Sequence, residues 1–157
     1  MINLKKIVFL SLIVFIIDQI VKILIGFNVS LNTSIKIIDD FFYISNVHNY
    51  GAAFSILYGN RIFLIFVSFF ALVFVYYFML KNKELKRFDI AICSLLIGGI
   101  LGNLFDRIIY GYVVDFFDFH IFGYNFPIFN IADICIVISI FLIIIDTLRG
   151  DKSENNC

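Results

Sequence analysis

Four long apolar stretches dominate the pattern of hydrophobic and polar positions along the chain. They cover residues 7–25, 62–80, 88–109 and 127–148. A helix needs about 20 mostly apolar residues to cross the hydrocarbon core of a bilayer, so the pattern predicts four transmembrane helices. The first stretch follows two lysines, as a cleavable signal peptide would. It is too long for one, contains polar residues and lacks a clear small-x-small cleavage site, so we expect it to be retained.

The connection after the first stretch, residues 26–61, is not a plain linker. It contains two runs of β-branched and aromatic residues, at 34–38 and 41–47, separated by Asp39 and Asp40. Such runs bounded by turn-forming residues are typical of short strands. We therefore expect a small β-structure that rests on the membrane surface.

The connection after the third stretch, residues 110–126, mixes many aromatic residues with a few polar ones. This composition is typical of an interfacial segment, such as a short amphipathic helix. The polar tail at residues 150–157 is expected to be disordered. Together these patterns predict a single integral membrane domain over residues 1–157.

Basic residues are unevenly distributed over the predicted connections. They gather before the first helix, between the second and third, and after the fourth, as Lys5, Lys6, Lys81, Lys83, Lys86, Arg87, Arg149 and Lys152. The other two connections hold only Lys36, Arg61 and the helix-end Arg107. Because basic residues near the span ends stay in the cytoplasm, we expect both termini there, with residues 26–61 and 110–126 on the outer face.

Composition supports the membrane prediction and narrows the chemistry. The 157 residues are 62% apolar and 15% charged, with a mean hydropathy of +1.01, whereas soluble domains are about 45–50% apolar. The net charge is zero, so no basic excess points to nucleic acid. The three cysteines show no CxxC spacing and the two histidines lie far apart. We therefore expect neither a metal site nor a disulfide framework.

Almost all costly polar residues of the predicted helices lie at one depth. With the orientation above they fall in or just beyond the outer leaflet, as Asp18, Lys22, Asn103, Asp106, Arg107, Asn130 and Asp133, then Asp115 and residues 49–54. Within each helix, spacings of three and four residues place them on one face. A charge in mid-membrane costs roughly 2.5–3.5 kcal/mol on insertion scales, so this cluster indicates a site or a set of mutual contacts.

Most members of the cluster also have a purely structural interpretation. These are an intrahelical ion pair for Asp18 and Lys22, an interfacial anchor for Asp106 and Arg107, interhelical hydrogen bonds for Asn103 and Asn130, and a loop carboxylate for Asp115. Asp133 fits such an interpretation least, because no basic residue lies three or four positions away. Gly98, Gly99 and Gly102 most simply allow close helix packing.

The cluster offers carboxylates, amides and one arginine, and it contains no reactive serine or cysteine with a nearby histidine. Two carboxylates that share a site cannot both ionise easily, so one can act as base on a water while the other acts as acid. That chemistry suits hydrolysis of a peptide bond, and glycosidases also use it. Asp115 and Asp133 form the best pair because both can reach the outer interface, and Asp106 is a competitor.

Five blocks of residues closely resemble those of bacterial lipoprotein signal peptidases, the signal peptidase II family of intramembrane aspartic proteases. In chain order they are Asp18-Gln19-x-x-Lys22, Asn49-x-Gly51-Ala52-Ala53-Phe54, Gly98-Gly99-x-x-Gly102-Asn103-x-x-Asp106-Arg107, Val113-Val114-Asp115-Phe116 and Phe129-Asn130-x-Ala132-Asp133. The resemblance extends over about residues 5–148. Five blocks in the family's order are far more specific than any one of them.

The resemblance implies a fold and a set of roles. The fold is an all-α membrane protein with four transmembrane helices, a small extracytoplasmic β-cradle in residues 26–61 and a mobile interfacial segment in residues 110–126. The catalytic dyad falls on Asp115 and Asp133. The positions that bind substrate or support the site are Asp18, Lys22, Asn49, Gly51, Asn103, Asp106, Arg107 and Asn130.

The resemblance also implies an activity: removal of the signal peptide from prolipoproteins, on the amino side of a diacylglyceryl-modified cysteine. The expected place is the outer face of the bacterial cytoplasmic membrane, and the expected partners are the prolipoprotein and membrane lipid, with the enzyme a monomer. No cofactor or metal is implied, and the antibiotic globomycin is expected to block the site. Of the dyad, we take Asp133 as the more desolvated carboxyl and hence as the acid.

The alternative is a non-enzymatic membrane protein, either a small transporter or a scaffold built on interhelical polar contacts. Intramembrane carboxylates also mark ion pathways, but a pathway needs ionisable groups through the full membrane depth. The second and fourth predicted helices carry no charge between the outer cluster and the inner rim. This distribution favours the protease.

Overall fold

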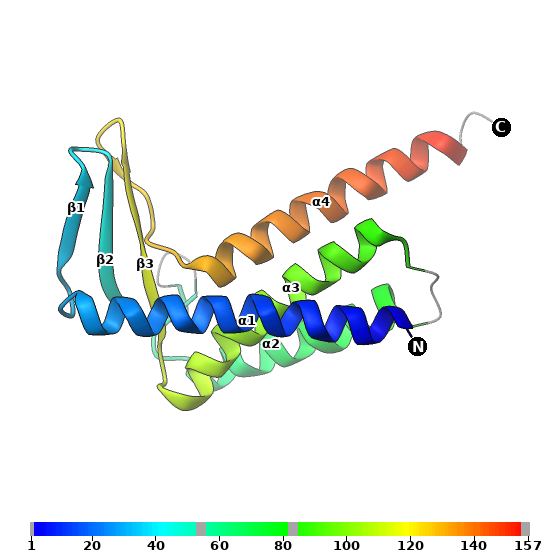
Figure 1. Ribbon diagram of the computed structural model, residues 1–157, viewed down its shortest axis with the longest axis horizontal. Coiled ribbons are helices and arrows are strands. Elements are labelled where there is room, and N and C mark those ends of the chain that lie inside the picture. Colours follow the sequence, from blue (N-terminus) through cyan, green and yellow to red (C-terminus); the bar gives the residue numbers. More distant parts are fainter. Residues whose placement is uncertain (1, 53–55, 82–84, 155–157) are drawn as a thin grey trace.

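A computed structural model describes residues 2–52, 56–81 and 85–154 of the chain, and the expectations for Ala53, Phe54, Lys83 and Cys157 lie outside them. Its four long helices are α1 (Ile2–Asn28), α2 (Arg61–Val75) with its π-helical continuation η2 (Tyr76–Leu80), α3 (Arg87–Ile109) and α4 (Ile131–Glu154). All four are long and apolar enough to cross a membrane, which confirms the predicted spans. Figure 1 shows the helices extending from a small sheet at one end of the molecule.

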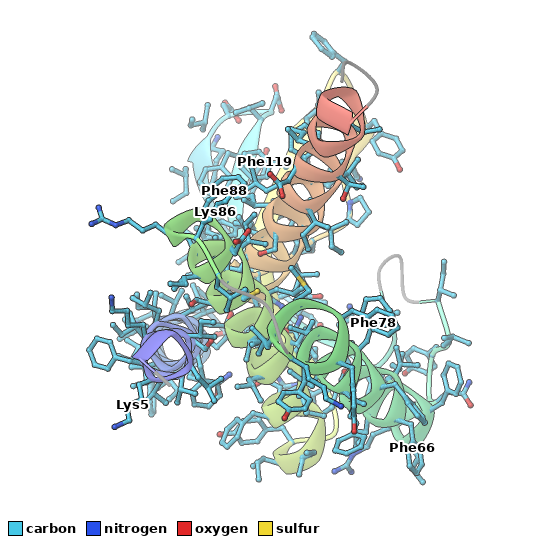
Figure 2. The ribbon with its side chains drawn as sticks, turned by 90° about the vertical axis from the view of Figure 1, so that its right-hand side faces the viewer. Lys5, Phe66, Phe78, Lys86, Phe88 and Phe119 are labelled. Atoms are coloured by element: carbon cyan, nitrogen blue, oxygen red, sulfur yellow. The ribbon has the colours of Figure 1, made fainter. Side chains whose placement is uncertain are left out.

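Helix α3 is the centre of the bundle and packs against each of the other three helices. The end-on view in Figure 2 shows α3 between α1, α2 and α4. Its glycines permit this arrangement, because a Cβ on Gly98 would lie 2.6 Å from Val14 of α1, and one on Gly99 would lie 2.6 Å from the backbone of α4. The expectation that these glycines allow close packing is therefore confirmed.

The outer faces of the helices are apolar and exposed. Large side chains such as Phe66 and Phe78, both labelled in Figure 2, leave more than half of their surface uncovered by the protein. In a soluble domain so many exposed aromatic and aliphatic groups would promote aggregation. Such an apolar exterior fits a multi-pass membrane protein.

The sheet consists of β1 (Ser34–Ile38), β2 (Phe42–Asn49), β3 (Val113–Ile121) and β4 (Tyr124–Asn125), antiparallel and in this order. The first two strands confirm the predicted β-structure between the first two spans. Strand β3 comes from the connection before the fourth span and pairs with β2, so that Asp115 lies opposite Val47.

Two expectations about the connections are wrong. Residues 113–121 form a strand instead of a short amphipathic helix, because this segment, rich in β-branched and aromatic residues, pairs along its backbone with β2. The tail is helical as far as Glu154 instead of disordered from residue 150. A single glycine costs only about 1 kcal/mol within a helix, so Gly150 does not end α4.

The fourth helix starts later than the sequence pattern predicts. The predicted span begins at Pro127, whereas α4 begins at Ile131. The intervening residues are extended because the backbone of Phe129 exchanges hydrogen bonds with Phe117 of β3, at 2.8 and 3.2 Å. Asn130 then caps the helix, and this tie to the sheet brings the first turn of α4 beside β3.

Candidate active site

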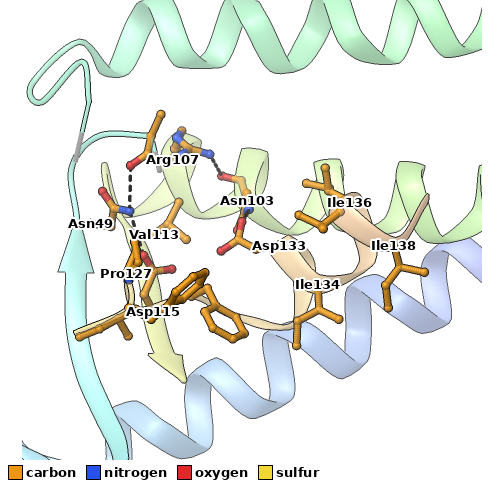
Figure 3. A pocket seen from close by; sticks show the side chains of 15 residues that line it. Asn49, Asn103, Arg107, Val113, Asp115, Pro127, Asp133, Ile134, Ile136 and Ile138 are labelled. Carbon is orange, nitrogen blue, oxygen red and sulfur yellow. Dashed lines mark hydrogen bonds between the residues drawn. The ribbon is translucent and has the colours of Figure 1, made fainter. Parts of the chain in front are cut away.

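A cavity of about 520 Å³ lies where the sheet meets α3 and α4. One side is polar, and Figure 3 shows the side chains of Asn49, Asn103, Arg107, Asp115 and Asp133 gathered there. The other side is apolar and includes the aromatic and aliphatic residues Phe126, Phe129, Ile134, Val137 and Ile138. The cavity thus joins a cluster of hydrogen-bonding groups to an apolar wall that follows α4.

Asp115 is held at the polar side from strand β3. Only 3% of the residue is exposed, and its two carboxyl oxygens accept hydrogen bonds from Asn49 Nδ2 at 2.8 Å and Asn130 Nδ2 at 2.7 Å. Burial, together with the nearby negative charge of Asp133, raises the pKa of Asp115 to about 7. This carboxyl group can therefore hold a proton near neutral pH.

Asp133 is held differently, in the first turn of α4. Its backbone N–H donates to Asn130 Oδ1 at 2.9 Å, and its Oδ2 accepts from the Asn130 backbone N–H at 3.2 Å. This reciprocal pair is a capping box, and a helix N-terminus favours a negative charge. Asp133 is also half-buried, so the expectation that it is the more desolvated carboxyl is wrong: Asp115 is more deeply buried.

Two asparagines connect these carboxyl groups. Asn103 Nδ2 of α3 donates to Asp133 Oδ1 at 2.7 Å, while Asn130 Nδ2 donates to Asp115 and, at 3.2 Å, to Asn103 Oδ1. Both interpretations of these asparagines from the sequence, interhelical hydrogen bonds and support of the site, therefore apply. The two side chains link α3 to α4 and also orient the two carboxylates. This chain of hydrogen bonds brings together residues from three separate sequence blocks.

A buried ion cluster lies directly behind the asparagines. Lys22 Nζ contacts Asp18 Oδ2 and Asp106 Oδ2, each at 2.7 Å, and donates to Asn103 Oδ1 at 3.1 Å. All three charged side chains are at most 3% exposed. Because Lys22 donates a hydrogen bond to the side-chain oxygen of Asn103, the side-chain amide nitrogen of Asn103 points to Asp133.

Asp18 also reaches the start of α4. Its Oδ1 accepts a hydrogen bond of 2.9 Å from the backbone N–H of Ala132, one of the N–H groups that a helix start leaves without an internal partner. Asp18 and Lys22 are thus both an ion pair and a support that fixes α1 and α4 beside the cavity. Gln19, to which sequence analysis gave no role, joins them by donating to Asp106 Oδ1 at 2.9 Å.

The competing candidate Asp106 does not share the site of Asp115 and Asp133. It is 1% exposed, forms an ion pair with Lys22, and is not among the described side chains that line the cavity. Its neighbour Arg107 does line the cavity and donates from Nη2 to the carbonyl of Gly51 at 3.0 Å. Asn49 holds the same turn, because its Oδ1 accepts the Gly51 N–H at 2.8 Å.

The described structure therefore brings all ten predicted site residues into one network of hydrogen bonds and ion pairs around the cavity: Asp18, Lys22, Asn49, Gly51, Asn103, Asp106, Arg107, Asp115, Asn130 and Asp133. Arg107 of α3 and Gly51 of the turn after β2 join it through Asn103 and Asn49.

Comparison with known proteins identifies the family of the chain. The sequence profile of the family described as Signal peptidase (SPase) II matches residues 10–149. A lipoprotein signal peptidase of Staphylococcus aureus is 38% identical over 149 residues, which are 95% of this chain and 91% of that protein. The corresponding protein of S. aureus strain JH9 is 40% identical over 147 residues, or 94% and 90% of the two chains.

Solved structures show the same fold. A bacterial membrane enzyme determined by the in meso method at 2.3 Å resolution is similar with a TM-score of 0.85 and 38% identity, covering 95% of this chain and 91% of that one. A second such enzyme, at 1.9 Å, has a TM-score of 0.80 and 39% identity, covering 92% and 93%. Profile, sequences and fold agree over nearly the whole chain, which therefore belongs to the signal peptidase II family.

Proposed function

We propose that this protein is an aspartic endopeptidase that removes the signal peptide from diacylglyceryl-modified prolipoproteins, cutting on the amino side of the lipidated cysteine. Membership of the family supports a protease that acts on lipoproteins. The observation that carries the aspartic assignment is the pair Asp115 and Asp133, which line one cavity and are linked through Asn103 and Asn130.

The different environments of the two carboxyl groups assign their roles. Asp115, with its raised pKa, starts as the acid and hydrogen-bonds the carbonyl oxygen of the scissile peptide bond. Asp133, at the capped start of α4, starts as the base and takes a proton from the attacking water. This assignment reverses the one based on the sequence.

The reaction then proceeds in two proton-balanced steps. The water oxygen bonds to the carbonyl carbon as Asp133 takes the water proton and Asp115 donates its own proton to the carbonyl oxygen, which gives a tetrahedral diol. The diol collapses when the carbon–nitrogen bond breaks. The leaving amine takes the proton from Asp133, and a diol hydroxyl returns a proton to Asp115, so both carboxyl groups regain their starting states.

Polar neighbours of the dyad position the substrate and the carboxyl groups. Asn49, Asn103 and Asn130 orient the dyad through the hydrogen bonds described above, and rigid support of this kind is what a reactive geometry requires. Arg107 lines the cavity with three donor groups on a planar guanidinium, suited to holding peptide carbonyls. The ion cluster of Asp18, Lys22 and Asp106 fixes α1, α3 and α4 relative to one another.

The apolar wall of the cavity supports the proposed substrate. A lipoprotein precursor presents a transmembrane signal helix, then the scissile bond, then a cysteine whose acyl chains remain in the bilayer. The apolar wall formed by Ile134, Val137 and Ile138 offers a surface for such apolar groups beside the carboxyl pair. We place the site at the outer face of the bacterial cytoplasmic membrane, with both termini in the cytoplasm and the enzyme acting as a monomer among membrane lipids.

The test is cleavage of a purified diacylglyceryl-modified prolipoprotein in detergent, with the product masses read by mass spectrometry. The proposal predicts a new N-terminus at the lipidated cysteine, and no cleavage of a matched precursor whose cysteine is replaced by serine. Cleavage at another bond, or equal cleavage of both precursors, would contradict the substrate assignment. A transporter or scaffold would cleave neither precursor while a control enzyme cleaved the first.

A further inference from the structure

Two arginines join the last turn of α3 to the chain that leads from β2 to α2. Arg107 Nη2 donates to the carbonyl of Gly51 at 3.0 Å. In the other direction, Arg61 donates from Nε to the carbonyl of Arg107 at 2.6 Å and from Nη2 to the carbonyl of Ile108 at 2.7 Å. The last turn of α3 therefore holds both ends of this connection: its Arg107 side chain donates to Gly51 at one end, and its carbonyls accept from Arg61 at the other.

The carbonyls that Arg61 binds are ones that the helix end cannot satisfy itself. The backbone N–H groups of Tyr110 and Gly111 both donate to the backbone carbonyl of Asp106, at 2.8 and 3.2 Å. The next two carbonyls, of Arg107 and Ile108, have no following helical N–H and are reached by the guanidinium of Arg61. A cation at the C-terminal end of a helix also interacts favourably with the helix dipole.

The turn after α3 leaves space for this guanidinium. Gly111 has a φ of +87°, and a Cβ at this position would lie 3.3 Å from Arg61 Nη1. Two residues later the chain enters β3, which carries Asp115. Arg61 therefore touches the turn that leads to the dyad as well as the helix end that carries Arg107.

The outer half of α2 has few other attachments. Leu64 and Val75 are its buried side chains among the residues that the structure describes, and the capping position Asn60 makes no side-chain hydrogen bond to the helix. Arg61 is itself exposed at the first position of α2 and is not one of the described residues that line the cavity. Any effect of Arg61 on catalysis must therefore pass through the groups that it holds.

We propose that Arg61 is a positioning residue for the peptidase reaction, which it serves by fixing the last turn of α3 and thereby the wall of the cavity formed by Arg107 and Gly51. The inference rests on the proposed function of that cavity. Asp115 and Asp133 are held by asparagines that Arg61 does not touch, so loss of Arg61 acts on substrate binding more than on the chemical step. A merely structural role would instead lower the amount of active enzyme and leave KM unchanged.

The experiment compares Arg61→Ala and Arg61→Lys with wild type for KM, kcat and thermal stability in detergent. We expect Arg61→Ala to raise KM about five- to tenfold, as for loss of a pair of charge-assisted hydrogen bonds, with kcat within about twofold of wild type. Arg61→Lys restores a single donor group in place of the planar fork, so its KM lies between those of wild type and Arg61→Ala. Lys36→Ala, an exposed basic residue in β1 that pairs with Asp39, is the charge control and leaves KM unchanged.

Two glycine substitutions test whether the effect on KM depends on the position of the Arg61 side chain. Gly111→Ala and Gly123→Ala both place a side chain at a positive φ, of +87° and +79°, but only the first crowds Arg61. We expect Gly111→Ala to raise KM and Gly123→Ala to leave it unchanged. In the Arg61→Ala background, Gly111→Ala should add no further change in KM, because the group that it displaces is already gone.

Hydrogen exchange of the backbone amides provides a measurement that does not depend on catalysis. The amides of residues 109–112 should exchange faster in Arg61→Ala than in wild type, while those of the β3–β4 turn stay unchanged. The inference is overturned if Arg61→Ala leaves KM and this exchange unchanged, or if Gly123→Ala raises KM equally. A wild type that cleaves no lipoprotein contradicts the proposed function, and a wild type that cleaves while Arg61→Ala matches it contradicts this inference alone.

Discussion

At the scale of single residues, the two central carboxyl groups differ because their environments differ. Asp115 is almost completely buried on a strand and faces a second negative charge. Asp133 caps the start of a helix and is half-buried. An acid and a base can therefore coexist in one cavity near neutral pH, and the difference between the two environments decides which carboxyl group holds the proton.

This difference predicts the alkaline limit of activity. Since burial raises the pKa of Asp115 to about 7, kcat/KM should fall above about pH 7 as this group loses the proton that the reaction needs. The Asn49→Ala variant removes a hydrogen-bond donor that favours the charged form, so the pKa of Asp115 rises and the alkaline limb moves to higher pH. The measurement is kcat/KM from pH 5 to 9, and a limb that moves to lower pH would contradict the assignment.

The buried lysine predicts a large loss of stability. Lys22→Met leaves Asp18 and Asp106 buried without their shared counter-ion, which should lower the free energy of unfolding by about 3–5 kcal/mol. Adding Asp106→Asn to Lys22→Met should restore part of the loss. The control Lys36→Met breaks an exposed ion pair and should cost at most about 1 kcal/mol, measured by unfolding in detergent. Equal losses for the two lysine variants would count against the buried cluster.

At the scale of elements, contacts far apart in the sequence decide what local patterns leave open. The four spans follow from length and hydropathy, and β1 and β2 follow from β-branched and aromatic runs. The sequence pattern does not predict strand β3, because its partner β2 lies more than 60 residues earlier and a local pattern carries no information about that pairing. The start of α4 was misplaced for the same reason, since the tie between Phe129 and Phe117 is a tertiary contact.

Helix packing at Gly102 gives a prediction at this scale. A Cβ on Gly102 would lie 2.6 Å from Asp18 Oδ2 and 3.3 Å from Ala132 Cβ, so Gly102→Ala should disturb the bond between Asp18 and the start of α4. We expect a net destabilisation of about 1–3 kcal/mol and reduced cleavage. Gly26→Ala, in α1 with no atom within 4 Å of the new Cβ, should instead stabilise by up to about 1 kcal/mol. A Gly102→Ala protein as stable as Gly26→Ala would argue against this packing.

At the scale of the whole molecule, the sheet and the ends of α3 and α4 that lie beside it build one site. Residues of the predicted site could be named from the sequence because the five blocks resemble a known family, whereas periodicity alone left Asp106 as a rival to Asp115 and Asp133. The structure separates them, because Asp106 forms an ion pair with Lys22 behind the cavity. Gln19 and Arg61 received no role from the sequence, since a single polar residue gives no pattern until its partners are known.

The proposed orientation predicts which positions a reagent can reach from outside the cell. In a Cys157→Ser background, Asp39→Cys in the exposed β1–β2 turn should react with a membrane-impermeant maleimide on intact cells. Lys81→Cys, after η2, should react only once the membrane is made permeable. The native Cys93 and Cys135 are buried and serve as the unreactive background. The opposite labelling pattern would reverse the proposed topology.

The most direct test of the carboxyl pair is cleavage of the lipidated precursor by three single variants. Asp115→Asn and Asp133→Asn should each lower kcat by at least about 10³-fold while remaining folded, as judged by thermal unfolding, because each removes a proton-transfer group. Asp39→Asn, an exposed carboxylate of the same outer region, should keep wild-type activity. If either dyad variant retained near-wild-type kcat, the assignment of Asp115 and Asp133 as the catalytic pair would be wrong.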